Sequence, residues 1–459
     1  MTERSEQELV RFQKLEKLRE RGYPYPNDVN ITAQSKDILQ AEVKPQEESE
    51  RFTLAGRILQ IRLMGKASFC HILDGAGKIQ IYVRKSDVGD ESYELYKDFD
   101  IGDIIEVKGY PFDTKTGERS LHVEEVRLLS KCLIPLPEKW HGLTDVETRY
   151  RQRYVDLIAN IEAREIFRKR SRILHLLRSF LDRHDFIEVE TPVLHYVAGG
   201  AEAKPFETHY NALHADMNLR IALELPLKKL VVGGLERVYE IGRVFRNEGL
   251  SKKHNPEFTM LEFYQAYADF ESLMQLTQDL IVHLAQEVVG TLLIPYGDEV
   301  IDLTPPWPRM KMTDSLYEIG GVPSTYDVHS LNGLLALADD RNIELRDRTD
   351  WGRCLDDLWG DLVEPKMRNP VFLTHHPFSI SPLARKNIEN PLITDRFELI
   401  IAGMEMANAF SELNDPVDQR ERFEEQASRK EQGDEEMPDV EEDFLRALEY
   451  GLPPTGGEG

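Results

Sequence analysis

This sequence of 459 residues has few cysteines and no long apolar run. Its three cysteines, Cys70, Cys132 and Cys354, are too scattered for a disulfide framework or for a zinc site, whose ligands pair about two to four residues apart. No uninterrupted apolar run approaches the roughly 18 residues that span a bilayer. The N-terminal stretch MTERSEQELVRF has neither the apolar core of a secretory signal nor the Arg-rich character of a transit peptide. We therefore expect no redox, zinc or membrane role, and a cytoplasmic location.

Basic charge is also in short supply. Lys and Arg number 57 against 82 Asp and Glu, a formal net charge of −25, and a polyanionic partner usually requires a basic surface. The excess is uneven, however, because residues 391–459 carry 6 basic and 19 acidic residues whereas residues 51–130 carry 12 and 13. The nearly neutral segment can present a basic face, so the net charge does not exclude a nucleic-acid partner.

The first 130 residues divide into a helical extension and a β-rich module. Residues 1–50 contain a predicted amphipathic helix over 5–22, with an apolar stripe at Leu9, Phe12, Leu15 and Leu18. Residues 51–130 show five short strand-like runs broken by the turns DGAG and DTKTG, with a helical piece near 90–97. This pattern suits a five-stranded OB barrel, although another small β-barrel fits it too.

The rest of the chain predicts an α+β domain. Residues 131–159 form a linker that contains prolines and then basic and aromatic residues, and residues 160–459 begin with an amphipathic helix from Asn160 to about Arg183. FIEVETPVL (186–194) follows as a strand that ends at a proline. Strands and helices then alternate without a regular βαβ rhythm, so we expect an antiparallel sheet flanked by helices rather than a doubly wound parallel sheet.

The densest group of polar residues lies in a predicted hairpin over 237–264 with the strands VYEIGRVFR and EFTMLEFY. Strand alternation places Arg246 and Glu248 on one side of the first strand. It likewise places Glu262 and Tyr264 on one side of the second strand. The loop adds two further polar residues, His254 and Asn255. A solvated hairpin is the simpler interpretation, but these charges interrupt apolar strands, and buried unpaired charges are costly. A ligand with anionic and cationic parts would satisfy them.

A second polar group lies in ELIIAGMEMANAFSELND, residues 398–415. Glu398 and Glu405 are separated by an apolar segment, and Asn408 and Glu412 follow. Two carboxylates near a bound polyphosphate suit Mg²⁺, which takes oxygen ligands and shares them with phosphates, although either carboxylate alone would be read as structural. Other cationic residues are each expected on a solvated surface: Lys228, Lys229 and those of ARKN (384–387).

In this order, the pieces resemble class II lysyl-tRNA synthetases along essentially the whole chain. The resemblance rests on FIEVETPVL, on FRNEG through EFY, and on ANAFSELND followed by ALEYGLPPTGG. FIEVETPVL resembles that family's first class motif, with Pro192 at a dimer interface, and FRNEG through EFY resembles its second class motif. The resemblance implies an antiparallel catalytic sheet, a homodimer, and ATP-dependent joining of L-lysine to tRNA(Lys).

The resemblance also implies how ATP is held. Arg246 would bridge the carboxylate of the amino acid and the α-phosphate of ATP, a task for which a planar bidentate cation suits better than lysine. Glu398 and Glu405 would ligate Mg²⁺ that bridges the phosphates. The adenine and the phosphates would be held by hairpin residues: Glu248, His254 and Asn255, with Phe258 stacked on the adenine ring.

For the amino acid, the resemblance assigns the α-ammonium to Glu224 and the backbone at Gly200, with Asn408 near the carboxylate. The side-chain ammonium is assigned to a second set: Glu412 and Tyr264, supported by Glu262. Two carboxylates in one pocket favour a cationic side chain, since an aspartate substrate would leave them unpaired. Arginine and ornithine are harder to exclude, because pocket length discriminates by only about 1–3 kcal/mol per methylene.

In the β-rich module, the resemblance implies recognition of a U-rich anticodon by stacking and by hydrogen bonds to base edges. The matching positions are Arg62, Phe69, Gln80 and Glu118. An exposed aromatic ring among polar residues suits single-stranded bases, but the alternative that Phe69 belongs to the core stays open.

The run GLPPTGGEG resembles the point at which that family continues into its third class motif, a glycine-rich strand and a helix whose arginine grips the γ-phosphate of ATP. We therefore expect a C-terminally truncated synthetase with an exposed apolar edge where that strand and helix would pack. Two functions stay open. One is an ATP-dependent lysine–tRNA ligase, and the other is a non-catalytic remnant that binds tRNA or a partner protein.

Overall fold

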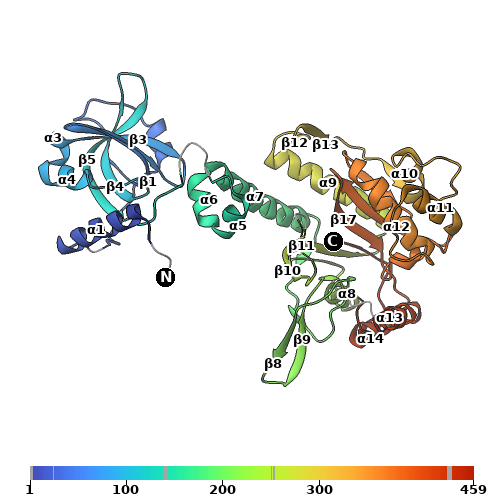
Figure 1. Cartoon of the computed structure of the whole chain (residues 1–459). Coiled ribbons are helices and arrows are strands. Elements are labelled where there is room, and N and C mark those ends of the chain that lie inside the picture. The colour runs from blue at the N-terminus through green and yellow to red at the C-terminus, as the bar shows by residue number, and fades with distance from the viewer. Residues whose placement is uncertain (1–3, 24, 138–142, 250, 252–253, 432–436) are drawn as a thin grey trace. The chain divides into compact units, whose positions relative to one another are not determined.

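The computed structural model describes residues 4–23, 25–137, 143–249, 251, 254–431 and 437–459. The chain folds into two compact units, Met1–Ile166 and Phe167–Gly459 (Figure 1). The predicted linker falls in the first unit, and its residues 138–142 lie outside the described residues.

The first unit is built around a closed barrel of five strands in the order β1-β2-β3-β5-β4. The strands are β1 (Phe52–Met64), β2 (Ala67–Leu73), β3 (Lys78–Arg84), β4 (Ile104–Asp113) and β5 (Arg119–Ser130). Two short helices, α3 (Lys85–Val88) and α4 (Asp90–Tyr96), connect β3 to β4. Alternate residues of β3, such as Ile79 and Ile81, point into the core. The predicted OB barrel is confirmed.

Helices flank this barrel along the chain. They are α1 (Glu6–Glu20), α2 (Ser35–Gln40), α5 (Val146–Arg151) and α6 (Arg153–Ala159). Helix α1 begins with a capping box, in which the Ser5 side chain accepts from the Glu8 N–H and the Glu8 side chain accepts from the Ser5 N–H. The predicted four-residue stripe is wrong in part, because Leu15 and Leu18 are buried but Leu9 is 49% exposed. Steps of three residues turn a helix by about 300°, so such a stripe drifts off the buried face.

The second unit contains an eight-stranded sheet in the order β14-β15-β16-β17-β18-β11-β10-β6. The strands are β6 (Ile187–Glu188), β10 (Arg237–Phe245), β11 (Glu257–Ala266), β14 (Arg309–Lys311), β15 (Val371–Thr374), β16 (Arg396–Ile401), β17 (Met404–Ser411) and β18 (Thr455–Glu458). Only the outermost pairs, β6 with β10 and β14 with β15, run parallel. The predicted antiparallel α+β architecture is confirmed.

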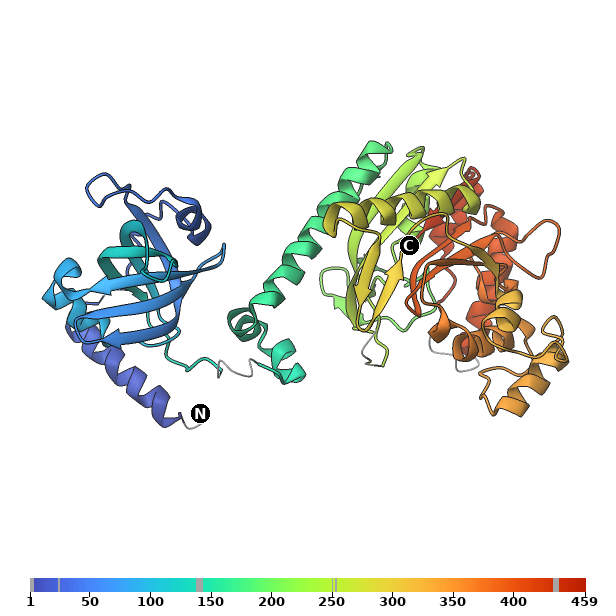
Figure 2. The same ribbon diagram turned by 90° about the horizontal axis from the view of Figure 1, so that it is seen from above.

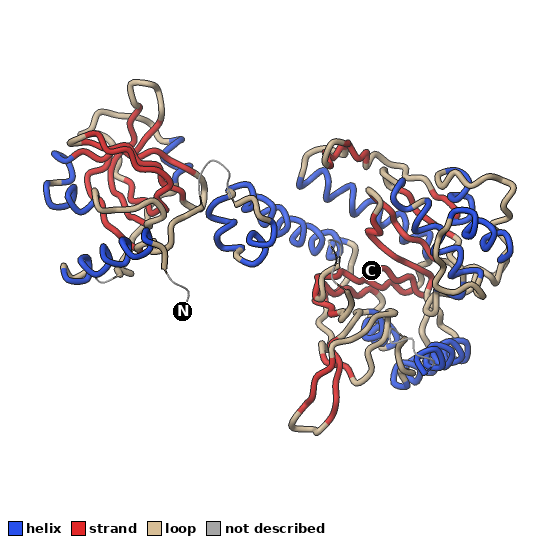
Figure 3. The backbone as a smooth tube through the Cα atoms, in the orientation of Figure 1, coloured by secondary structure: helices blue, strands red, loops and turns tan. Residues whose placement is uncertain are grey.

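Two smaller β-structures and two 3₁₀ turns complete the second unit. Strands β7 (Leu194–His195), β9 (Ala215–Leu219) and β8 (Glu207–Tyr210) form a small sheet, and β12 (Leu293–Tyr296) pairs with β13 (Glu299–Asp302). Figure 3 shows the β8–β9 hairpin projecting from this unit. The 3₁₀ turns are η1 (Glu364–Lys366) and η2 (Phe378–Ile380).

Helices cover both faces of the large sheet. They are α7 (Ile161–Arg183), which contains the boundary between the units, α8 (Glu224–Val232), α9 (Phe270–Val288), α10 (Met312–Glu318), α11 (Leu331–Arg341), α12 (Trp351–Leu362), α13 (Pro416–Glu431) and α14 (Glu442–Glu449). On one face Phe263 packs in a core with α7 and α9, and Figure 2 shows α9 lying along the sheet. The next residue, Tyr264, points to the opposite face and packs with α8 and α14. Among the described helices, none has the length and apolar character that crossing a membrane requires.

The strand predicted over 186–194 is wrong, because the structure has only two short pieces there, β6 and β7. Between them the Thr191 backbone N–H and hydroxyl both donate to the buried carboxylate of Glu240, at 3.0 and 2.6 Å. Pro192 then has no N–H to offer a neighbouring strand. The backbone here is therefore held by a side chain instead of a strand partner.

The glycine-rich run at 455–458 forms β18, which lies between β11 and β17 in the middle of the sheet. Gly457 pairs with Tyr264 on one side and with Phe410 on the other. The sequence interpretation placed the glycine-rich strand beyond GLPPTGGEG, whereas these residues already contribute strand pairing. The label C in Figure 1 accordingly lies within the sheet.

Candidate functional site

A cluster of buried polar side chains lies on the sheet face that α8 and α14 cover. Its members, which we call the acidic cluster, are Glu224, Lys228, Glu262, Tyr264 and Glu412. Glu224 and Lys228 are one helical turn apart on α8, Glu262 and Tyr264 alternate on β11, and Glu412 directly follows β17. Three elements that are distant in sequence thus bring three carboxyl groups, one ammonium and one phenol together.

Ion pairs and hydrogen bonds connect the acidic cluster. The Lys228 ammonium lies 2.5 Å from Glu224 Oε1 and also pairs with Glu412. The Tyr264 hydroxyl donates to Glu262 Oε2 at 2.9 Å, and the Leu223 backbone N–H donates to Glu262 Oε1 at 2.8 Å. The predicted surface position of Lys228 is therefore wrong, because its side chain is fully buried. Its neighbour Lys229 is partly exposed and pairs with two other carboxylates, those of Glu441 and Asp443.

Burial raises the pKa of all three carboxyl groups in the acidic cluster. It raises the pKa of Glu262 to about 7, and the charge of Glu224 adds to this effect. It also raises the pKa of Glu224 and takes that of Glu412 well above its usual range, in both cases against the opposing charge of Lys228. For Lys228, burial by itself lowers the pKa, but the charges of Glu224 and Glu412 outweigh it and leave the pKa raised. The cluster therefore keeps its cation and resists full ionisation of its acids.

Two glycines let backbone approach the acidic cluster closely. Gly200 has φ +90°, and a Cβ atom there would lie 3.2 Å from Glu224 Cβ. A Cβ atom on Gly457 would lie 2.0 Å from Glu412 Oε1 and 2.3 Å from Tyr264 Cε1. Both sites therefore depend on the absence of a side chain.

The residues assigned to ATP lie in and beside the β10–β11 loop. Strand β10 ends at Phe245, so the predicted position of Arg246 and Glu248 on the strand is wrong. The Arg246 backbone N–H still donates to Pro256 O at 2.9 Å, which keeps the side chain beside β11. Its guanidinium lies 5.3 Å from the centre of the Phe258 ring.

The other residues of this loop that were assigned to ATP differ from the buried acidic cluster in exposure. Glu248, His254 and Asn255 are exposed. His254 is held locally, since its Nδ1 and the Ser251 hydroxyl lie 2.7 Å apart. Leu250, Lys252 and Lys253 of the same motif lie outside the described residues.

The two carboxylates assigned to the metal line one cavity of about 440 Å³. Arg396 donates to Glu398 Oε1 at 2.6 Å and to Asn408 Oδ1 at 3.1 Å. Solvent still reaches Glu405, yet the protein packed around it raises its pKa to about 7, and the charge of Glu398 adds to this. Such mutual repulsion is relieved by a cation.

Oxygen donors of this kind fit Mg²⁺. Among the described residues, however, no group of three or more His, Cys, Asp or Glu side chains could hold a metal by itself. The two carboxylates would therefore need further oxygen ligands, which phosphates and water supply.

Sequence reasoning missed two residues beside Glu398: Arg396, which lines this cavity, and His376. His376 is buried, its Nδ1 lies 4.0 Å from Glu398 Oε1, and burial holds its pKa well below the usual range. The alternation of RFELII on β16 places Arg396 on the same side as Glu398 and was the available signal for the arginine. No comparable signal marked His376.

On the barrel, Phe69 is directly opposite Arg62 on β1 and Tyr82 on β3. Phe69 is half-buried and lies outside the barrel core, so the core alternative is wrong. Its ring centre is 4.9 Å from that of Tyr82. The resulting aromatic row continues to residues that the sequence interpretation did not name, Phe112 and His122.

The polar positions on the barrel meet next to this row. Gln80 Nε2 donates to Glu118 Oε2 at 2.9 Å, and the His71 ring lies 3.4 Å from the other oxygen of Glu118. Gln80 in turn accepts a hydrogen bond from the Ser120 hydroxyl at 2.9 Å. Arg62, Phe69, Gln80 and Glu118 thus lie on neighbouring strands and a loop of one barrel.

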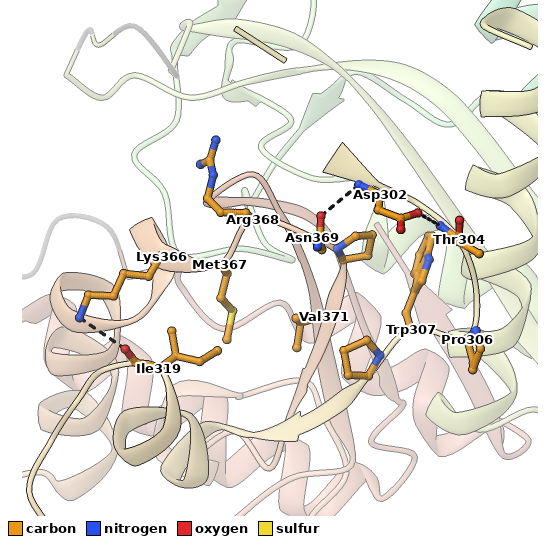
Figure 4. Close-up of a pocket in the computed structure, with 12 residues that line it drawn as sticks. Asp302, Thr304, Pro306, Trp307, Ile319, Lys366, Met367, Arg368, Asn369 and Val371 are labelled. Carbon is orange, nitrogen blue, oxygen red and sulfur yellow. Dashed lines mark hydrogen bonds between the residues drawn. The ribbon is translucent and has the colours of Figure 1, made fainter. Parts of the chain in front are cut away.

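A separate cavity of about 360 Å³ lies near the β12–β13 hairpin, lined by Trp307, Met367 and neighbouring residues (Figure 4). Polar groups that line this cavity form hydrogen bonds with nearby residues of the same unit. The Asp302 N–H donates to Asn369 Oδ1 at 3.0 Å, and Lys366 Nζ donates to Gly320 O at 3.0 Å. None of the site residues assigned from sequence lines this cavity.

A largely antiparallel sheet whose central strands carry buried carboxylates, together with an OB barrel, is the architecture expected of a class II aminoacyl-tRNA synthetase, and two family models place the chain in this class. The family model for class II tRNA synthetases (D, K and N) matches residues 145–459, and the model for OB-fold nucleic acid binding domains matches residues 52–129.

Relatives identify the family within this class. The chain is 49% identical to a lysine–tRNA ligase of Bacillus thuringiensis over 463 aligned residues, which cover 100% of this chain and 93% of the relative. It is 50% identical over 456 residues to a lysine–tRNA ligase of Dehalococcoides mccartyi, which covers 98% of this chain and 91% of that protein. The chain belongs to the lysine–tRNA ligase family.

Proposed function

We propose that this protein activates L-lysine with ATP and joins it to tRNA(Lys) for translation, with the cytoplasm as its setting. In the first step the lysine carboxylate attacks the α-phosphorus of ATP, and pyrophosphate leaves. In the second step a terminal ribose hydroxyl of the tRNA attacks the acyl carbon, and AMP leaves. The observation that carries the proposal is the acidic cluster, in which three buried carboxyl groups face a single buried cation, so that a further cation is needed to balance them when they are ionised.

Lysine would be held at both ends. Glu224 and the backbone at Gly200 take the α-ammonium, and their close approach supports this pairing. The side-chain ammonium is bound by Glu412 and Tyr264, with Glu262 held in place by its two hydrogen bonds. Asn408 lies near the substrate carboxylate.

Arg246 is the proposed catalytic residue. It would bridge the lysine carboxylate and the α-phosphate and stabilise the charge that develops as the carboxylate attacks. Its position beside β11 and over Phe258 supports a place at the adenine side of the site. The remaining contacts to ATP are proposed for Glu248, His254, Asn255 and Phe258.

Glu398 and Glu405 would hold Mg²⁺ together with the phosphates of ATP. When bound, the ion supplies charge neutralisation for the pyrophosphate leaving group. Since the lysine carboxylate is already ionised at neutral pH, the protein itself contributes position and electrostatics, without a general base.

The barrel would bind the anticodon of tRNA(Lys) through Arg62, Phe69, Gln80 and Glu118. The half-buried aromatic row beside polar groups supports base stacking at this surface. A homodimer is proposed as well, because apolar side chains around Pro192 are exposed in the single chain: Ile187, Val193 and Leu194.

Lysine-dependent exchange of labelled pyrophosphate into ATP tests the activation step. We expect exchange with lysine and none with aspartate, and we expect Glu412→Gln to reduce it strongly. Lysine-dependent exchange that Glu412→Gln leaves unchanged would show the side-chain assignment to be wrong. No exchange, combined with retained tRNA binding, would instead favour the non-catalytic alternative.

A further inference from the structure

We infer that Lys228 is a positioning residue for lysine recognition: an internal cation that holds Glu224 and Glu412 in place. When the three carboxyl groups ionise on binding, it leaves the acidic cluster with two negative charges for the two ammonium groups of the substrate. The inference rests on the proposed function, because it concerns the same cluster.

The geometry fixes Lys228 between the two carboxylates that would bind opposite ends of lysine. Its ammonium lies 2.5 Å from Glu224 Oε1 and pairs with Glu412, and its side chain is fully buried. The rings of Phe410 and Phe444 enclose it, with centres 5.5 and 5.8 Å from the ammonium. Because a turn of α8 separates it from Glu224, the helix sets this arrangement.

Charge explains why an internal cation is useful here. The three carboxyl groups of the cluster carry three negative charges when ionised, and Lys228 cancels one of them. The two negative charges that remain balance the two ammonium groups of the lysine substrate. The carboxylate of that substrate is assigned to Arg246. Without Lys228 a third buried charge would stay unpaired, and such a charge is costly enough that a carboxyl group would take up a proton instead.

Glu412 keeps acceptor capacity for a ligand. Although it pairs with Lys228, neither of its buried oxygens accepts a hydrogen bond of ordinary geometry from the described residues. A substrate ammonium can therefore donate to Glu412 while Lys228 stays where it is. The Lys228–Glu412 pair differs in this respect from the buried Arg220–Glu240 pair. There the Glu240 carboxylate also accepts two hydrogen bonds from Thr191, so its acceptor capacity is used within the fold.

The titratable groups around Lys228 come from several elements. Glu224 lies on α8, the helix that carries Lys228 itself. The elements packed against α8 contribute Glu262 and Tyr264 from β11 and Glu412 from the residue after β17, and α14 contributes the Phe444 ring. Arg396 on β16 acts on Glu224 from farther away. Removal of the Lys228 charge would raise the carboxyl pKa values further, because the cation opposes the effect of burial at both Glu224 and Glu412.

Isothermal titration of the full chain with L-lysine, without ATP, tests this role. The variants are Lys228→Met, which keeps length and loses charge, and Lys228→Gln, which keeps polarity if the first fails to fold. Lys229→Met is the matched control, since that lysine pairs on the outer side of α8. Titration in buffers of different ionisation enthalpy at pH 6 to 9 also counts the protons released on binding.

We expect loss of the Lys228 charge to weaken lysine binding by about 30-fold or more. We also expect more protons released per lysine, and an acid limit of binding that moves to higher pH, because carboxyl groups with higher pKa values must ionise to bind the ammonium groups. The control should match the wild-type chain.

Three results would overturn the inference. The first is unchanged lysine affinity in the Lys228 variants. The second is weaker binding with an unchanged proton count and pH profile, as a purely structural ion pair predicts. The third is the same loss of affinity in Lys229→Met. Absence of lysine binding by the wild-type chain would instead count against the proposed function, so the two failures are distinguishable.

Discussion

Gly457 and Glu412 touch across the junction of β18 and β17: a Cβ atom on Gly457 would lie 2.0 Å from Glu412 Oε1. The same atom would lie 2.3 Å from Tyr264 Cε1. Alanine at 457 must therefore displace both side chains assigned to the substrate ammonium. We expect Gly457→Ala to weaken lysine binding by about 10-fold or more, measured by titration, since buried charged partners tolerate little displacement.

Gly456 supplies the control for this substitution on the same strand. A Cβ atom there would meet the flexible end of Leu273 at 3.0 Å, on the α9 face of the sheet. Gly456→Ala should lower thermal stability without a change in lysine affinity. Equal loss of affinity in both variants would mean that β18 acts through general stability.

The sequence predicted those parts of the fold in which side chains repeat with a clear period. The barrel strands alternate apolar and polar residues, and β11 shows the same alternation at Glu262 and Tyr264. Lys228 was misplaced because LPLKKLVV shows two adjacent lysines, and adjacency does not reveal which one faces the core. Its spacing of four residues from Glu224 was the signal that favoured burial beside that carboxylate.

Other errors came from contacts between residues distant in sequence. FIEVETPVL has the composition of a strand, but Thr191 donates its hydrogen bonds to Glu240, 49 residues later. Arg246 and Glu248 were assigned to β10 because alternation continues past Phe245, where the strand ends. Within the Arg396–Glu398–His376 group, alternation on β16 indicated only that Arg396 and Glu398 share a side, whereas the place of His376 beside Glu398 depends on the pairing of β15 with β16, which no local pattern encodes.

Glu458 gives the fold a predictable pH dependence. Its carboxyl group is buried on β18, accepts a hydrogen bond from the Thr277 hydroxyl at 2.5 Å, and has its pKa raised by burial to about 8. Between the usual value of 4.5 and about 8, the folded chain keeps a proton that the unfolded chain has released. This group's contribution to the free energy of unfolding therefore falls as pH rises through that window.

Glu458→Gln removes this titration and keeps the size of the side chain. Relative to the wild-type chain, the variant should gain stability between pH 5 and pH 8, on the order of 2 kcal/mol. Urea unfolding at the two pH values measures the difference, and exposed Glu449→Gln serves as control. A stability difference that is the same at both pH values would contradict the prediction.

Glu405 should affect the dependence on Mg²⁺ more than the affinity for lysine. It lines the same cavity as Glu398, and the charge of Glu398 adds to the effect of the surrounding protein in raising the pKa of Glu405 to about 7. We expect Glu405→Gln to raise the Mg²⁺ concentration for half-maximal pyrophosphate exchange by about 10-fold or more, since loss of even an outer-shell partner of a metal ligand has an effect of this size.

Asp356→Asn is the control for Glu405→Gln, because Asp356 lines the same cavity but pairs with Arg346. Its Mg²⁺ dependence should match the wild-type chain. If both variants changed the Mg²⁺ requirement equally, the cavity as a whole and not the Glu398–Glu405 pair would set it.

Phe69 should contribute to tRNA binding and not to amino-acid activation. Its ring is half-buried beside Tyr82, outside the barrel core, and one base stacked on such a ring contributes about 1–3 kcal/mol. Phe69→Ala should therefore weaken binding of tRNA(Lys) by about 5- to 150-fold in a filter-binding measurement and leave lysine-dependent pyrophosphate exchange unchanged. Phe12→Ala on α1, which removes another partly buried aromatic ring of the same unit, should leave tRNA affinity unchanged. The decisive comparison uses a tRNA with a substituted anticodon: if Phe69→Ala weakened its binding as much as that of tRNA(Lys), the ring would not read the anticodon.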